Sequence, residues 1–171
     1  MLNSEKHSIY VNDLYDVVEI VGKDAIDLVQ RISTNDILKL SEKSFLSTIF
    51  LNDKGKVVDI VQATKINETL FGISFGVEIL SEWIDKFVFT EDVSVNRSNF
   101  TYCDVILAEG SIVLLDSELS PGKVNTLEFN GIELYAFVEY SNHVKLLIPN
   151  EIINDVLSLE EFESINSIVF N

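Results

Sequence analysis

The sequence has few cations, and this scarcity excludes several functions. Lys and Arg together make up 12 of its 171 residues, against 28 Asp and Glu, so the formal net charge is −16. Nucleic-acid binding depends on Lys and Arg to neutralise phosphates, and an anionic membrane surface attracts clustered cations. We therefore expect neither nucleic acid nor membrane as a partner. The charge favours solubility, and a basic protein partner is the sharper alternative.

Cysteine and histidine are also scarce. Cys103 is the single cysteine, which excludes an intrachain disulfide and a cysteine-rich zinc site. The two histidines, His7 and His143, show no spacing typical of metal ligands, so we expect no metal. Cys103 lies in a stretch with strand character, which predicts a packed thiol rather than a nucleophile.

Glycine-rich phosphate loops and long apolar runs are missing. Neither Gly-x-Gly-x-x-Gly nor Gly-x-x-x-x-Gly-Lys occurs, which argues against nucleotide binding through those loops. No apolar run approaches the ~18 residues of a membrane span, and no basic-then-apolar leader opens the sequence. We therefore expect a cytoplasmic protein. No linker composition marks a boundary, which predicts a single domain over residues 1–171.

What the sequence does contain is a large apolar fraction, 47%, arranged in strand and helix patterns. Periodicity near 3.6 predicts helices over residues 23–32, 77–88 and 150–157. Apolar β-branched runs predict strands over 7–11, 16–21, 45–51, 56–66, 70–75, 93–95, 102–107, 112–115, 126–129, 133–139, 143–148 and 165–170. The turn Asn52-Asp53-Lys54-Gly55 predicts a hairpin between two of these runs. Helices separated by hairpins indicate an α+β fold with antiparallel or mixed sheets and about three helices.

Asp59 is the candidate functional residue. Alternation along its strand places its side chain on the same face as Val57 and Val61. A carboxylate in such a setting must be paired, hydrogen-bonded or exposed, because an isolated buried charge is too costly. One interpretation is a carboxylate that receives a cationic or amine-bearing ligand. The alternatives are an edge strand that faces water, or an ion pair with one of the ten lysines. Asp104 raises the same question, and exposure at a strand end accounts for it.

Three segments around Asp59 resemble the folate-binding domain of the glycine-cleavage T-protein family, whose superfamily includes the YgfZ-type iron–sulfur assembly factors. The first is Val21-Gly22-Lys23-Asp24-Ala25, where a strand enters a helix. The second is Thr34-Asn35-Asp36, where that helix ends, and the third is the hairpin strand Gly55-Lys56-Val57-Val58-Asp59. The resemblance extends over residues 16–107.

The resemblance implies a folate-binding-domain-like fold of two interlocked β-α-β repeats and a tetrahydrofolate or related reduced-folate ligand. It also implies that Asp59 approaches the pterin-linked nitrogens, as the aspartate at this place does in aminomethyltransferases. The late Gly-Tyr-Thr-Gly-Glu-x-Gly-x-Glu motif of T-proteins and the Lys-Gly-Cys-Tyr-x-Gly-Gln-Glu motif of YgfZ-type proteins are both missing. We therefore expect a folate-binding protein without the C-terminal barrel domain of both groups, and not a complete aminomethyltransferase.

Two other functions stay open at this point. A non-catalytic acidic scaffold would keep the fold and lose the ligand, with Phe45, Phe71 or Phe75 filling the cavity. A redox or iron–sulfur accessory protein would act through Cys103, although the motif that carries the YgfZ cysteine is missing.

Overall fold

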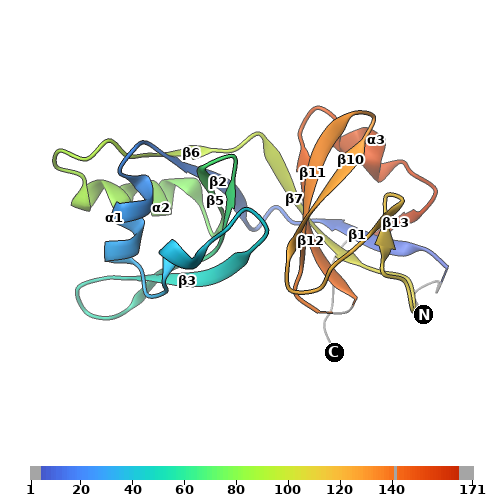
Figure 1. Cartoon of the computed structure of the whole chain (residues 1–171), viewed down its shortest axis with the longest axis horizontal. Helices are drawn as coiled ribbons and strands as arrows, with labels where there is room; N and C mark the ends of the chain where they lie inside the picture. The colour runs from blue at the N-terminus through green and yellow to red at the C-terminus, as the bar shows by residue number, and fades with distance from the viewer. Residues whose placement is uncertain (1–4, 141, 166–171) are drawn as a thin grey trace. The chain divides into compact units, whose positions relative to one another are not determined.

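A computed structural model describes residues 5–140 and 142–165 of the chain (Figure 1). The chain divides into two units, each with its own sheet and core. Unit 1 comprises residues 1–13 and 99–171, and unit 2 comprises residues 14–98. The chain thus begins in unit 1, passes through the whole of unit 2 and then returns.

Unit 2 is built on a five-stranded antiparallel sheet in the order β3-β4-β5-β2-β6. Its strands are β2 (Asp16–Val21), β3 (Phe45–Leu51), β4 (Val57–Ile66), β5 (Thr69–Ser74) and β6 (Ser94–Arg97). Its helices are α1 (Ala25–Ile32) and α2 (Val77–Ile84), with 3-10 turns η1 (Ile37–Lys39) and η2 (Asp85–Phe87). Both α-helices pack their apolar stripes against the sheet residues Val18, Ile20, Phe50 and Val61 in one core.

The predicted hairpin between β3 and β4 is confirmed. The Asn52 side chain accepts hydrogen bonds from the backbone N–H of Lys54 at 3.0 Å and of Lys56 at 2.9 Å. Gly55 adopts φ +72°, which suits a residue without Cβ. A bulge between Phe50 and Leu51 shifts the register beside Asp59. The turn chemistry thus fixes which residue of β3 lies opposite the candidate carboxylate.

The two helices of unit 2 form where predicted but are shorter. The first begins at Ala25 rather than Lys23, because Gly22 has φ +115° and Asp24 is not helical. The second ends as an α-helix at Ile84 and tightens into η2. In both cases the apolar periodicity predicts the helix, and the backbone conformation of the terminal residues determines where the helix begins or ends.

Unit 1 is built on a six-stranded mixed sheet in the order β10-β11-β12-β7-β1-β13. Its strands are β1 (His7–Val11), β7 (Phe100–Ile106), β10 (Val124–Phe129), β11 (Ile132–Val138), β12 (His143–Pro149) and β13 (Phe162–Ser164). A two-stranded ribbon, β8 (Val113–Leu114) with β9 (Ser117–Glu118), lies outside it. β1 and β7 lie side by side although most of the chain separates them (Figure 1). Only β1 and β13 pair in parallel within the described sheets.

The third helix, α3 (Ile153–Leu157), is shorter than the predicted 150–157. It packs on one face of the unit 1 sheet through Val156, Ile153 and Leu157. The strand predicted over 165–170 falls almost wholly outside the described residues. The described elements nevertheless confirm an α+β fold with mixed and antiparallel sheets and three α-helices.

Candidate functional site

Asp59 lies near the start of β4, an inner strand of the unit 2 sheet, opposite Phe50 of β3. Its strand, β4, has a neighbour on each side, and the side chain is fully buried at 0% exposure. The expected alternative of an edge strand facing water does not hold. No ion pair within the described residues involves Asp59, so the lysine alternative does not hold either. The carboxylate therefore depends on neutral hydrogen-bond donors.

Two donors from the junction between β5 and α2 bind the Asp59 carboxylate. The Ser74 hydroxyl donates to Oδ2 at 2.5 Å, and the Phe75 backbone N–H donates to Oδ1 at 3.2 Å. The Ser74 oxygen in turn accepts a hydrogen bond from the backbone N–H of Gly76 at 3.2 Å. Asp59 thus ties the end of β5 to the first turn of α2.

A second carboxylate, Asp16, binds the same junction. Its Oδ2 accepts the backbone N–H of Val77 at 2.9 Å, and its Oδ1 pairs with Arg97. Arg97 also pairs with Glu78 at 3.4 Å. The hydrogen bond to Asp16 raises the pKa of Arg97. The N-terminus of a helix carries partial positive charge, which is why two carboxylates are tolerated here.

An aromatic pair adjoins the Asp59 carboxylate. The ring of Phe75, whose backbone N–H binds Asp59, stacks on Tyr15 with centroids 5.2 Å apart and an interplanar angle of 24°. The Phe75 side chain is 45% exposed, so it does not fill an interior cavity. Phe71 is buried and Phe45 half-buried. The site therefore combines a buried carboxylate with a partly exposed stacking surface.

Asp16, Ser74 and the Tyr15–Phe75 pair were not predicted from the sequence. Asp16 and Val77 are 61 positions apart, and no local pattern connects them. Ser74 ends β5 and Phe75 follows it, directly before the second predicted helix. The prediction that Asp59 needs a hydrogen-bond partner was the one signal that could have pointed to donors between β5 and α2.

Asp104 is buried, not exposed at a strand end as the sequence suggested. Its strand, β7, lies between β12 and β1, and the side chain is 6% exposed. It accepts hydrogen bonds from Asn12 at 2.7 Å and from Tyr102 at 2.5 Å, and contacts His143 Nε2 at 2.8 Å. Burial alone would raise the pKa of Asp104, but these hydrogen bonds, led by that of His143, outweigh it and lower the pKa.

Cys103 is a packed thiol, as predicted. Its side chain is fully buried, and burial, with a smaller effect of Asp104, raises its pKa to about 12. A thiol with such a pKa is a poor nucleophile at neutral pH. The accessory function through Cys103 therefore has no support in the geometry.

The described residues provide neither a metal site nor a spanning helix. Among residues 5–140 and 142–165, no three His, Cys, Asp or Glu side chains come together as metal ligands would. In the same part of the chain, no helix has the length and apolar character needed to cross a membrane.

Comparison with known proteins identifies proteins of similar sequence and fold. No family model matches the sequence. An aminomethyltransferase from Alkaliphilus metalliredigens (strain QYMF) is 27% identical over 115 residues, which are 66% of this chain and 31% of that protein. The crystal structure of the glycine cleavage system aminomethyltransferase T from Bartonella henselae superposes with a TM-score of 0.74 at 12% identity. That alignment covers 95% of this chain and 49% of the other.

The chain thus spans about a third of the length of the curated relative and about half of the solved structure. The resemblance predicted from the segments around Asp59 is confirmed, in sequence over part of the chain and in fold over nearly all of it. The chain has the fold of one part of a glycine-cleavage aminomethyltransferase.

Proposed function

We propose that this chain is a reduced-folate-binding protein, related to aminomethyltransferases and to YgfZ-type assembly factors, in which Asp59 receives N–H groups of the pterin. The observation that carries the proposal is the Asp59 carboxylate itself. It is fully buried, and two uncharged donors of the chain, the Ser74 hydroxyl and the Phe75 N–H, bind it. A buried carboxylate without a cation is costly, and a ligand with polarised N–H groups offsets that cost.

The hydrogen-bonding capacity of Asp59 supports the same function. A carboxylate offers about four lone-pair positions, and the Ser74 and Phe75 donors occupy two of them. A pterin ring presents N–H donors along one edge. An ionised carboxylate at that edge orients the reacting amine and stabilises positive charge that develops on it.

The aromatic pair supplies a surface for the flat part of such a ligand. Aromatic rings stack in offset geometry on planar heterocycles, and Phe75, which stacks on Tyr15, is 45% exposed. Because Asp59 is fully buried in the structure, a ligand reaches the carboxylate only when the side chains that cover it move. We therefore expect binding to change the environment of Phe75.

We do not propose a complete aminomethyltransferase. The chain spans about half of the solved T protein, and the late glutamate-containing motif of that family is missing. We propose residues 1–171 as one folate-binding-like domain that acts in the cytoplasm and needs no metal. Any one-carbon transfer would require groups beyond those of residues 1–171.

A thermal-shift titration with tetrahydrofolate and 5-formyltetrahydrofolate tests the proposal. A ligand at about 100 times its Kd stabilises the folded state by about 2.7 kcal/mol, which raises the Tm of such a domain by about 5 to 10 °C. The parent and Asp53→Asn, an exposed aspartate of the β3–β4 turn, should both show this rise. Asp59→Asn should show a rise of at most about half that size, because its affinity for the ligand should be at least tenfold weaker.

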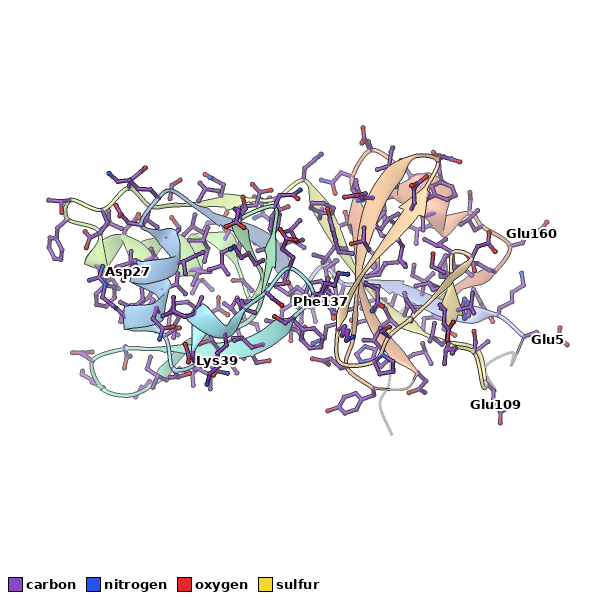
Figure 2. All side chains as sticks on the ribbon, viewed as in Figure 1. Glu5, Asp27, Lys39, Glu109, Phe137 and Glu160 are labelled. Carbon is purple, nitrogen blue, oxygen red and sulfur yellow. The ribbon has the colours of Figure 1, made fainter. Side chains whose placement is uncertain are left out.

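The acidic scaffold remains the second candidate, and the charge distribution favours it. Residues 1–13 and 99–171 contain three lysines against fourteen acidic residues, a net charge of −11. Figure 2 shows Glu5, Glu109 and Glu160 pointing outward from this unit. A flat thermal response in all three proteins would contradict folate binding and favour a basic protein partner.

A further inference from the structure

Two adjoining cavities lie in unit 2, at the end of the sheet where β4 turns into β5. The larger has a volume of about 250 Å³ and reaches from the end of β2 to α1, with Ile20 and Lys23 among its walls. The smaller has a volume of about 200 Å³. Ile26 and Leu70 line both, so the two cavities are neighbours separated by a thin wall of side chains.

The smaller cavity is mainly apolar. Its walls are Ile26, Ile37, Leu38, Leu40 and Leu70, together with Lys65. Ile37 and Leu70 are buried, whereas Leu38 is 67% exposed and so marks the side open to solvent. An apolar cavity of about 150 Å³ accommodates a benzene ring, so this one has room for an alkyl chain or an aryl ring.

An ion pair connects the two cavities. Lys65, which lines the smaller, pairs with Glu68, which lines the larger, at 2.6 Å. The Lys65 side chain is 20% exposed and that of Glu68 is 78% exposed. An ammonium group has three donors, and Glu68 occupies one of them. A pair with one partner so exposed contributes little stability, so Lys65 can bind a further carboxylate at small cost.

The walls of the two cavities are cationic in an otherwise acidic chain. Their charged lining residues are two lysines, Lys23 and Lys65, and one glutamate, Glu68, whereas the net charge of the whole chain is −16. An anion is repelled by most of the surface and attracted to this place. The smaller cavity is therefore an apolar recess with an ammonium group at its wall.

We propose that these cavities bind an amphipathic monocarboxylate, whose alkyl or aryl body occupies the smaller cavity and whose carboxylate pairs with Lys65. This site differs from the Asp59 site, since neither Asp59 nor its donors Ser74 and Phe75 line either cavity. The ligand class is distinct from a pterin, so the two sites can be tested independently.

Titration with octanoate, followed by calorimetry and by the methyl resonances of Ile26 and Leu70, tests the proposal. The parent should bind octanoate at millimolar or lower concentration and shift these methyl signals. Lys65→Met keeps the aliphatic stem and should weaken octanoate binding about tenfold or more, equivalent to about 1.4 kcal/mol. Lys54→Met, which removes an exposed lysine from the β3–β4 turn, should leave binding unchanged.

A second variant and a second ligand guard against effects on folding. Leu38→Glu changes an exposed side chain and adds a negative charge at the opening, so it should also weaken octanoate binding. Uncharged 1-octanol should bind the parent at least tenfold more weakly than octanoate. Asp53→Asn, an exposed aspartate of the β3–β4 turn, should bind octanoate as the parent does. Equal binding of octanoate by the parent and Lys65→Met, or no binding by the parent, would overturn the proposal.

Discussion

The Ser74 hydroxyl lies 2.5 Å from Asp59 Oδ2 and joins the end of β5 to a carboxylate near the start of the neighbouring strand, β4. This hydrogen bond replaces the cation that a buried carboxylate usually needs. It also sets the start of α2, because the same Ser74 oxygen accepts the Gly76 N–H. Asp59 is therefore part of the architecture of unit 2 as well as its candidate ligand-binding group.

Removing the Ser74 hydroxyl should destabilise unit 2. Ser74→Ala leaves one carboxylate oxygen without its short hydrogen bond in a buried setting, which costs about 1 to 3 kcal/mol. Trp83, the only tryptophan, lies on α2 and reports the unfolding of this unit in denaturant. Ser47→Ala, an exposed serine on β3, is the matched control and should change stability by less than about 0.5 kcal/mol. Equal stability of the two variants would show that the Asp59–Ser74 hydrogen bond contributes nothing.

Gly22 connects β2 to α1 and should not tolerate a side chain. Its φ is +115°, and a Cβ at this position would lie 1.9 Å from the backbone oxygen of Asp92. Gly22→Ala should therefore destabilise the protein by about 3 kcal/mol or more. Gly55→Ala is the matched control, with φ +72° and open space around the new methyl, and should cost about 1 kcal/mol. Similar costs for the two substitutions, measured by denaturant unfolding, would contradict the close approach of Asp92.

His7 should make unit 1 less stable in mild acid. Its Nδ1 accepts the backbone N–H of Ala108 at 2.9 Å, which requires the neutral ring, and burial lowers its pKa below 6.5. Below about pH 6.5 the unfolded chain therefore binds a proton that the folded chain does not. The resulting stability is present above that pH and is lost as the pH falls toward the folded-state pKa.

Unfolding of the parent and of His7→Gln at about pH 7.5 and about pH 5.5 measures this linkage. The parent should lose more stability than the variant on acidification. With two histidines in the sequence, the imidazole proton resonances can be assigned by comparison with the variant. A His7 pKa at or above 6.5 in the folded protein would show that the ring is not held neutral.

Local sequence patterns predicted the helices and strands well, but they did not predict which strands pair with one another. The Asn52–Gly55 turn and the helical periodicity of residues 77–84 depend on neighbouring residues, and both are confirmed. The order of the strands depends on contacts between distant segments. β7, in the middle of the sequence, pairs with β1 near the start and with β12 further along. This pairing places Asp104 in the sheet interior, which no local pattern could predict.

The same limit applies to the candidate site. The alternation that singled out Asp59 placed its side chain on one face with Val57 and Val61. Val61 is buried like Asp59, but Val57 is 55% exposed, because the bulge opposite Phe50 and Leu51 breaks the alternation. Its hydrogen bond with Ser74 depends on the register between β4 and β5, and the contribution of Asp16 depends on a residue 61 positions from α2. The apolar neighbours of Asp59 in the sequence could suggest that its carboxylate is buried. They could not identify Ser74 and Phe75 as its hydrogen-bond donors.

The affinity of 5-formyltetrahydrofolate for the parent and for Asp59→Asn, measured by calorimetry, tests the central claim most directly. The asparagine keeps the shape of the side chain, and the Ser74 hydroxyl can turn toward the Gly76 carbonyl at 3.3 Å, so the variant should fold. Loss of a charge-assisted hydrogen bond predicts affinity about tenfold to a hundredfold weaker in Asp59→Asn, and unchanged in Asp53→Asn. Equal affinities of the parent and Asp59→Asn, or no binding by a folded parent, would contradict the account.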